Sequence, residues 1–121
     1  MYGVPADLPL KQLVGQDLTA ITLAQYQITF HFSNTSALTA TTAWKLIDST
    51  GIVLDEACSP ENRTDYHLHG IIGVAVANFR IDAPLSFTLI FNSGHQLTIF
   101  DDGPQYESCT VVFPGKQPII I

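Results

Sequence analysis

A polar turn between two segments of alternating apolar residues occurs twice in this chain, and this recurrence constrains the fold most. The segments are FHFSNTSALTA (30–40) and LIFNSGHQLTI (89–99), which match position by position at one constant offset. The match pairs Phe32 with Phe91, each directly before its turn. Self-similarity at a fixed distance is typical of chains that repeat one supersecondary unit. We therefore expect two copies of one β unit.

The two copies span about residues 12–54 and 67–113. We interpret residues 1–121 as a single domain, because a chain of this length is about one domain. Upstream of the turns, the tripeptide ending at Gly15 matches the one ending at Gly70, at a slightly shorter offset than the turns themselves. The second unit would contain an additional segment, RIDAP, whose insertion accounts for the difference between the two offsets. The residues before and after this segment then match those of the first unit.

The segment ITLAQYQITFHF alternates with a period of two, which is typical of a half-buried strand. Ile28, Phe30 and Phe32 would face one side, and Thr29 and His31 the other. Strand-forming residues dominate the rest of the chain, and helical signals are confined to short turns before the two glycines. We predict an all-β fold: an antiparallel sandwich or small barrel of about eight to ten strands, with a pseudo-twofold axis between its halves.

The outer face of the second unit is more apolar than that of the first. At the offset that pairs Phe32 with Phe91, Ile90 takes the place of His31, and Phe100 that of Thr41. Exposed apolar patches often mark contacts, so we expect the C-terminal isoleucines, a short helix or a second subunit to cover this face. We predict a homo-oligomer, specifically a dimer. The predicted interface residues are Ile90, Phe100, Ile119, Ile120 and Ile121.

Eleven acidic and five basic residues give the chain a net charge of −6. A negative surface repels phosphate backbones and anionic membranes, and the basic residues are scattered. We therefore expect neither nucleic acid nor membrane as a partner. Only 13 % of the residues are charged, against about 25 % in an average soluble protein, which fits a chain that hides surface in an oligomer.

The N-terminal segment lacks the charged and apolar regions of a secretory signal, and no apolar run is long enough to span a membrane. These features predict a cytoplasmic protein. In that compartment Cys58 and Cys109 are expected to be free thiols.

The segment YHLHG places His67 and His69 one residue apart. On a strand they would share a face and could hold one metal ion, whereas on a helical turn they would point apart. No further ligand follows at cupin-like spacing, although His95 and Glu107 could supply distant ligands. The histidines are therefore candidate metal ligands, and the alternative is that they only introduce the second β unit.

Catalytic motifs are missing from the sequence. There is no nucleophile elbow and no glycine-rich phosphate loop, and Asp101-Asp102 falls in an evident turn. Tyr106 and Glu107 are the polar pair with a possible role, because a carboxylate beside a strand must face solvent, a partner or a buried hydrogen-bond network. We expect no enzymatic activity and no cofactor.

The segments LVGQDLTAI, FSNTSALT, FNSGHQLTIFDD, YES (106–108) and PIII resemble a family of small bacterial proteins of uncharacterised function. The resemblance covers about residues 10–121, and its specific part is DD followed by YES. That family has no assigned reaction or cofactor, so the resemblance implies no catalytic residues. A more distant likeness to Sm-type barrels would imply RNA binding, which the acidic charge disfavours.

Together these features predict a non-enzymatic, cytoplasmic, β-rich interaction protein that self-associates. Its negative charge would suit an acidic inhibitor or immunity-type partner of a basic target. The alternative hypothesis is a small-molecule or metal-binding β-barrel that uses His67, His69, His95 and Glu107.

Overall fold

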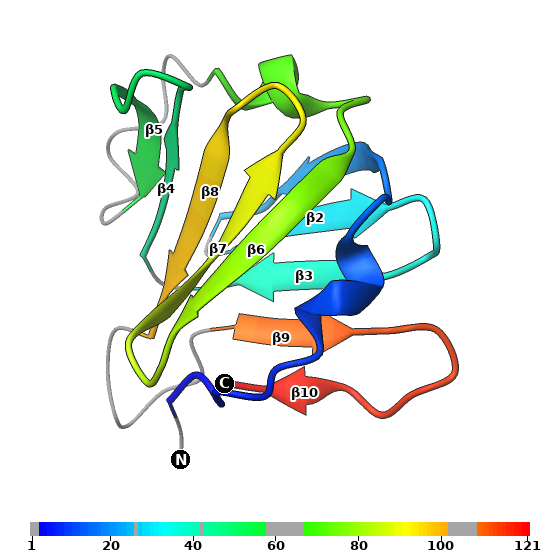
Figure 1. Cartoon of the computed structure of the whole chain (residues 1–121). Helices are drawn as coiled ribbons and strands as arrows, with labels where there is room; N and C mark the ends of the chain where they lie inside the picture. Colours follow the sequence, from blue (N-terminus) through cyan, green and yellow to red (C-terminus); the bar gives the residue numbers. More distant parts are fainter. Residues whose placement is uncertain (1–2, 26, 42, 58–66, 102–108) are drawn as a thin grey trace.

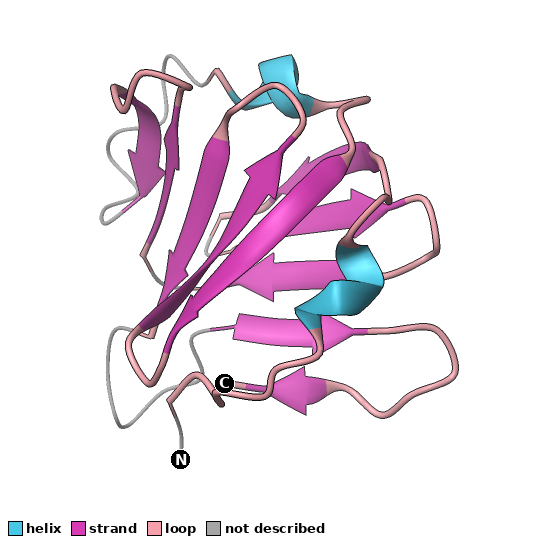
Figure 2. Cartoon of the chain, in the orientation of Figure 1, coloured by secondary structure: helices cyan, strands magenta, loops and turns pink. Residues whose placement is uncertain are grey.

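The computed structural model of the chain describes residues 3–25, 27–41, 43–57, 67–101 and 109–121. In these ranges the chain forms two antiparallel sheets of five strands each, with two short 3-10 turns (Figures 1 and 2). The predicted all-β fold is confirmed. The sheets are not closed into a barrel, so of the two expected architectures the sandwich is correct and the barrel is wrong.

The first sheet has the strand order β1 (Leu18–Leu23), β2 (Ile28–Phe32), β3 (Ala37–Ala40), β9 (Cys109–Val112) and β10 (Ile119–Ile120). The second sheet has the order β5 (Val53–Ala57), β4 (Trp44–Ile47), β8 (Gln96–Phe100), β7 (Ser86–Phe91) and β6 (Val76–Asp82). The 3-10 turns η1 (Leu10–Leu13) and η2 (Leu68–Ile71) precede β1 and β6. The elements therefore follow in the same order in both halves of the chain.

Each half contributes one hairpin to the sheet of the other half. The β4–β5 hairpin follows β3 in the chain, yet β4 pairs with β8, placing Leu46 opposite Leu97. The β9–β10 hairpin follows β8, yet β9 pairs with β3, placing Val111 opposite Leu38. Each five-stranded sheet therefore contains strands from both halves of the chain.

Reciprocal hydrogen bonds join the two halves where β1 and β6 begin. The amide of Gly15 donates to the carbonyl of Val76, and the amide of Gly73 donates to the carbonyl of Leu18, both at 2.7 Å. Gly15 and Gly73 have left-handed backbones, with φ of 86° and 90°, which a glycine adopts without a steric penalty. The structural counterpart of Gly15 is therefore Gly73. The expected match to Gly70 is wrong, because Gly70 lies inside η2. RIDAP is likewise not an additional segment, because its first three residues belong to strand β6.

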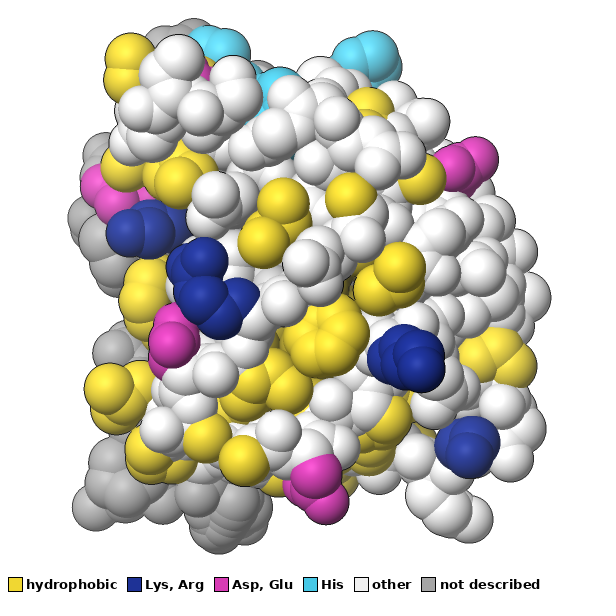
Figure 3. All heavy atoms as spheres, viewed as in Figure 1, with side chains coloured by type: hydrophobic (Ala, Val, Ile, Leu, Met, Phe, Trp, Pro, Cys, Tyr) yellow, Lys and Arg dark blue, Asp and Glu magenta, His cyan; other side chains and the backbone are white. Residues whose placement is uncertain are grey.

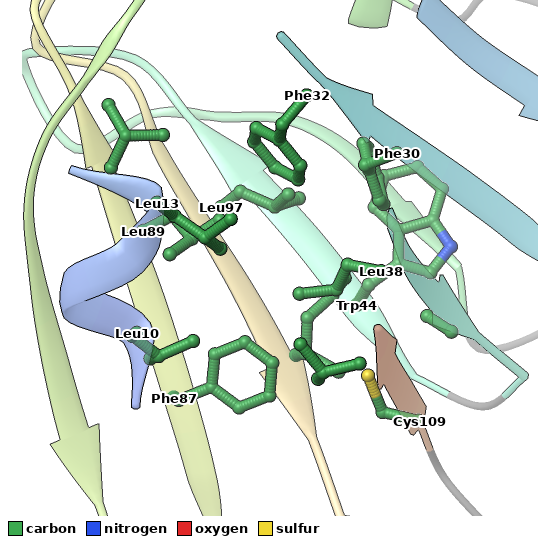
Figure 4. Close-up of a cluster of buried hydrophobic side chains, with 14 of the residues drawn as sticks. Leu10, Leu13, Phe30, Phe32, Leu38, Trp44, Phe87, Leu89, Leu97 and Cys109 are labelled. Atoms are coloured by element: carbon green, nitrogen blue, oxygen red, sulfur yellow. The ribbon is translucent and has the colours of Figure 1, made fainter. Parts of the chain in front are cut away.

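Apolar side chains from both sheets fill the space between them (Figure 4). The ring of Trp44 in β4 meets that of Phe30 in β2 edge to face, with centroids 6.4 Å apart. Leu10 and Leu13 are three residues apart in η1 and so lie on one face of the 3-10 turn. Both are buried and point into the same core as Phe87 (Figure 4).

Candidate functional site

Three of the predicted site residues lie around η2 and the neighbouring β7–β8 turn. His67 directly precedes η2, His69 lies within it, and His95 ends the turn before β8. Figure 3 shows histidine side chains gathered at this end of the molecule. His67 and His69 are not on a strand, and two residues apart in a 3-10 turn they point in different directions. The arrangement that would let both bind one metal ion is therefore absent here.

His67 is held by a buried carboxylate. Its backbone amide donates to Oδ2 of Asp55 at 2.6 Å, and its ring Nδ1 lies 3.1 Å from Oδ1 of the same carboxylate. The Asp55 side chain is 1 % exposed and that of His67 is 59 % exposed. Burying a carboxylate is costly unless donors satisfy its oxygens, and His67 supplies a donor to each. The pair thus fastens the start of η2 to the edge strand β5.

A histidine oriented by a carboxylate also occurs in hydrolytic triads, where it must reach a nucleophile. The described hydroxyl beside a histidine at this end is that of Ser93, whose Oγ lies 2.7 Å from Nδ1 of His95. Among the described residues, Asp55–His67 and Ser93–His95 are therefore two separate pairs. Burial raises the pKa of the Cys109 thiol to about 12, so this thiol is protonated at neutral pH and unsuited to nucleophilic attack.

Among the described residues, no group of three or more His, Cys, Asp and Glu side chains could hold a metal ion. Tyr106 and Glu107 lie outside the described residues. The barrel in the alternative hypothesis is wrong, because the sheets stay open.

The predicted interface residues lie on different faces of the molecule. Ile90 and Phe100 are on the outer face of the second sheet, where both are half-buried, and Nζ of Lys45 lies 5.8 Å from the Phe100 ring centroid. Ile120, 48 % exposed, lies on the outer face of the first sheet, opposite Thr110.

The other two isoleucines point inward. Ile119 pairs with the buried Val111 and packs against the core, and Ile121 is 1 % exposed. Ile121 is held in place by hydrogen bonds in both directions with the backbone of Cys109. The expectation that Ile121 contributes to an exposed interface is therefore wrong, because its own chain covers it.

A row of threonines crosses the outer face of the first sheet. Thr22 pairs with Thr29, which pairs with Thr39. Thr39 in turn pairs with Thr110, and Ile120 ends the row. The hydroxyls of Thr29 and Thr39 are hydrogen-bonded at 2.9 Å. The row gives this face a neutral, β-branched surface on four neighbouring strands.

The two sheets differ in their content of charged residues. In the described chain, the strands of the first sheet contain no Asp, Glu, Lys or Arg. The strands of the second sheet contain Lys45, Asp55, Glu56, Arg80 and Asp82. The row in the second sheet that corresponds to the threonine row reads Arg80, Thr88, Thr98, Lys45 and Glu56. The outer face of the first sheet is therefore the uncharged one.

Sequence reasoning did not identify the threonine row or Asp55. A signal for the row was present, because Thr88 and Thr98 follow Thr29 and Thr39 at the same offset as the paired phenylalanines. Asp55 had no comparable signal, since it lies next to Glu56 and only strand pairing places it opposite the buried Leu46.

No family model matches the chain, and no curated protein or solved structure was found to be similar to it. No helix in the described ranges is long and apolar enough to cross a membrane.

Proposed function

We propose that this protein is a non-enzymatic, cytoplasmic interaction protein that contacts another protein through the outer face of its first sheet. The observation that supports the proposal is the charge division between the sheets. Of the two outer faces, this one is free of charged strand residues in a chain with a net charge of −6.

The chemistry of this face suits protein contact. The centres of protein interfaces are depleted in charged residues, since burying an unpaired charge is costly. Threonine side chains are stiff at χ1, so little side-chain entropy is lost when a partner covers them. Thr39 and Thr110 lie in the middle of the face and are already half-buried by their neighbours. The expected partner surface is neutral and polar, with donors for threonine hydroxyls.

A photo-crosslinking residue placed at position 39 tests the proposal in cells that produce the protein natively. We expect one discrete crosslinked product from position 39 and its loss when Thr110→Glu is added on the same face. The matched control carries the crosslinking residue at Glu56, on the outer face of the second sheet, and should not give that product. A product that survives Thr110→Glu, or that forms equally from position 56, would contradict the proposal.

The narrower role of an acidic inhibitor rests on the net charge alone. The two roles differ in their response to salt, because electrostatic steering of an acidic protein onto a basic target weakens as ionic strength rises. If the protein associates through the neutral face, the association rate should be about the same at low and at physiological salt. A steep fall in the association rate as salt rises would favour the inhibitor role.

A further inference from the structure

Strand β1 is an edge of the first sheet, and its hydrogen-bonding pattern shows which of its backbone amides and carbonyls point away from β2. The amide of Ala24 donates to the carbonyl of Gln27 at 2.9 Å, which makes these two residues a hydrogen-bonded pair of the β1–β2 hairpin. Hydrogen-bonded and non-hydrogen-bonded pairs alternate along an antiparallel ladder. The amide and carbonyl of Thr22 therefore face β2, and those of Ile21 and Leu23 face away from the sheet.

Among the described residues, the protection of the β1 edge is confined to its start, where Leu18 bonds Gly73 and Val74 and the pairing with β2 is irregular between Leu18 and Ala20. Natural edge strands are protected by charged residues, by proline, by short length or by a covering segment. The β1 strand reads Leu-Thr-Ala-Ile-Thr-Leu, six residues without a charge or a proline. Leu23 at its end is 58 % exposed. An edge strand that is otherwise unprotected is a template for another strand.

The equivalent edge strand of the other half, β6, is protected. Thr22 is paired with Thr29, and its counterpart Arg80 is paired with Thr88. Nε of Arg80 lies 3.4 Å from the carboxylate of Asp82, so two charges stand on this edge strand. Figure 3 shows basic and acidic side chains side by side on this face of the molecule. The same position thus carries a charge in β6 and a neutral side chain in β1.

We propose that β1 pairs antiparallel with β1 of a second copy of the chain and joins the two first sheets into one ten-stranded sheet. The pairing is centred on Thr22, which lies opposite the partner's Thr22. Ile21 and the partner's Leu23 then form a hydrogen-bonded pair, as do Leu23 and the partner's Ile21, which gives four hydrogen bonds in all.

A second copy fits this edge better than another partner for two reasons. The outward groups of Ile21 and Leu23 are symmetric about Thr22, so the strand is complementary to itself around a twofold axis. Two chains of charge −6 repel each other, and β1 lets them meet without placing any charged strand residue at the contact. The pairing also covers exposed Leu23 with the partner's Ile21. The pairing between the two β1 strands cannot include Leu18, because the carbonyl of Leu18 already accepts a hydrogen bond from the amide of Gly73.

This surface is distinct from the middle of the threonine row, so the inference can fail without affecting the proposed function. The test measures the molar mass of the intact chain over a range of concentrations by sedimentation velocity. We expect a dimer for the natural sequence. Thr22→Arg gives β1 the residue that β6 has and sets two like charges opposite each other, so the dissociation constant should rise by about tenfold or more.

Two further variants locate the contact. Thr110→Arg adds the same charge to the same face but away from the edge, and it should leave the dimer intact. Leu23→Pro removes an amide that points away from β2, so it should weaken the dimer without breaking a bond of the β1–β2 ladder. Circular dichroism of each variant confirms that it is folded.

Hydrogen exchange gives a local readout, since the amides of Ile21 and Leu23 should become protected as concentration rises. The proposal is overturned by a monomer at every concentration. It is also overturned by a Thr22→Arg dimer as tight as the natural one, or by equal dissociation in Thr110→Arg.

Discussion

Thr35 and Gly94 occupy the same place in two matching turns, and both have left-handed backbones. The amide of Thr35 donates to the carbonyl of Phe32 at 3.0 Å, and that of Gly94 to the carbonyl of Phe91 at 2.9 Å. Their φ angles are 68° and 89°. This geometry is that of a three-residue hairpin loop that ends in a left-handed residue, a position that favours glycine. A β-branched residue there is strained.

Replacing the strained threonine should therefore stabilise the protein. We expect Thr35→Gly to raise the free energy of unfolding by about 1 kcal/mol, since relief of strain outweighs the greater flexibility of glycine in the unfolded chain. Urea denaturation measures the change. A lower midpoint for Thr35→Gly would show that contacts of the threonine side chain outweigh the strain.

The converse change at Gly94 should destabilise the protein for two reasons. Gly94→Ala forces a side chain into the left-handed region and places its Cβ 2.6 Å from Cβ of Ser49. Gly51→Ala is the matched control, because Gly51 has φ of 93° but no atom within 4 Å of the added Cβ. We expect urea denaturation to show a loss of about 1 kcal/mol for Gly51→Ala and a clearly larger loss for Gly94→Ala. Equal losses would mean that the Ser49 contact is relieved at no cost.

Asp55 should matter for stability because it satisfies two donors of His67. Asp55→Ala leaves the amide and the ring nitrogen of His67 without this acceptor, so we expect a loss of about 2–3 kcal/mol in thermal or urea unfolding. Glu56→Ala, the neighbouring exposed carboxylate, is the control and should change stability by about 0.5 kcal/mol or less. Similar losses for the two variants would refute an anchoring role for Asp55.

The two threonine pairs should differ in their response to loss of one hydroxyl. Thr88 and Thr98 are buried and their hydroxyls lie 2.8 Å apart, whereas the equivalent pair, Thr29 and Thr39, is only half-buried. Thr98→Val leaves the buried Thr88 hydroxyl without its closest partner, so we expect a loss of about 1–3 kcal/mol. Thr39→Val should cost less, because water can reach Thr29.

A double-mutant cycle checks this assignment. The double variant Thr88→Val/Thr98→Val should recover much of the stability lost in Thr98→Val, because no buried hydroxyl is left unpaired. Additive losses from the two substitutions would argue against coupling between the hydroxyls.

The turn between β4 and β5 should weaken in acid. The hydroxyl of Thr50 and then the amide of Ile52 hold the pKa of Asp48 below its usual value of 3.8, because both donate to its carboxylate. A depressed folded pKa contributes stability that is complete well above the unfolded pKa and is lost as the pH falls through the folded one.

The measurement compares the natural chain with Asp48→Asn by urea denaturation at neutral pH and below pH 3.8. The natural chain should be the more stable one at neutral pH, and the difference should shrink in the acidic range. A difference that is independent of pH would contradict the role of the ionised carboxylate.

Much of the local structure could be predicted from the sequence. The alternation in ITFHF predicts β2 with Phe30 inward, because the side chains of a strand point to opposite faces in turn. The turn before Leu38 follows from its polar residues, and in the described part of the chain helical structure is limited to two short turns, as expected. These features depend on neighbouring residues, so a linear pattern encodes them.

The tertiary structure decided which strands meet. Nothing local in β4 shows that it pairs with β8, which lies far along the chain, instead of the preceding β3. That choice depends on how the two halves pack around Trp44 and Phe30, because long-range pairing is selected by burial across the whole core. The same packing buried Asp55, drew Ile121 into the core, and left the uncharged strand β1 at an edge. The sequence determined the strands of this protein, whereas their assembly determined which of its surfaces can meet a partner.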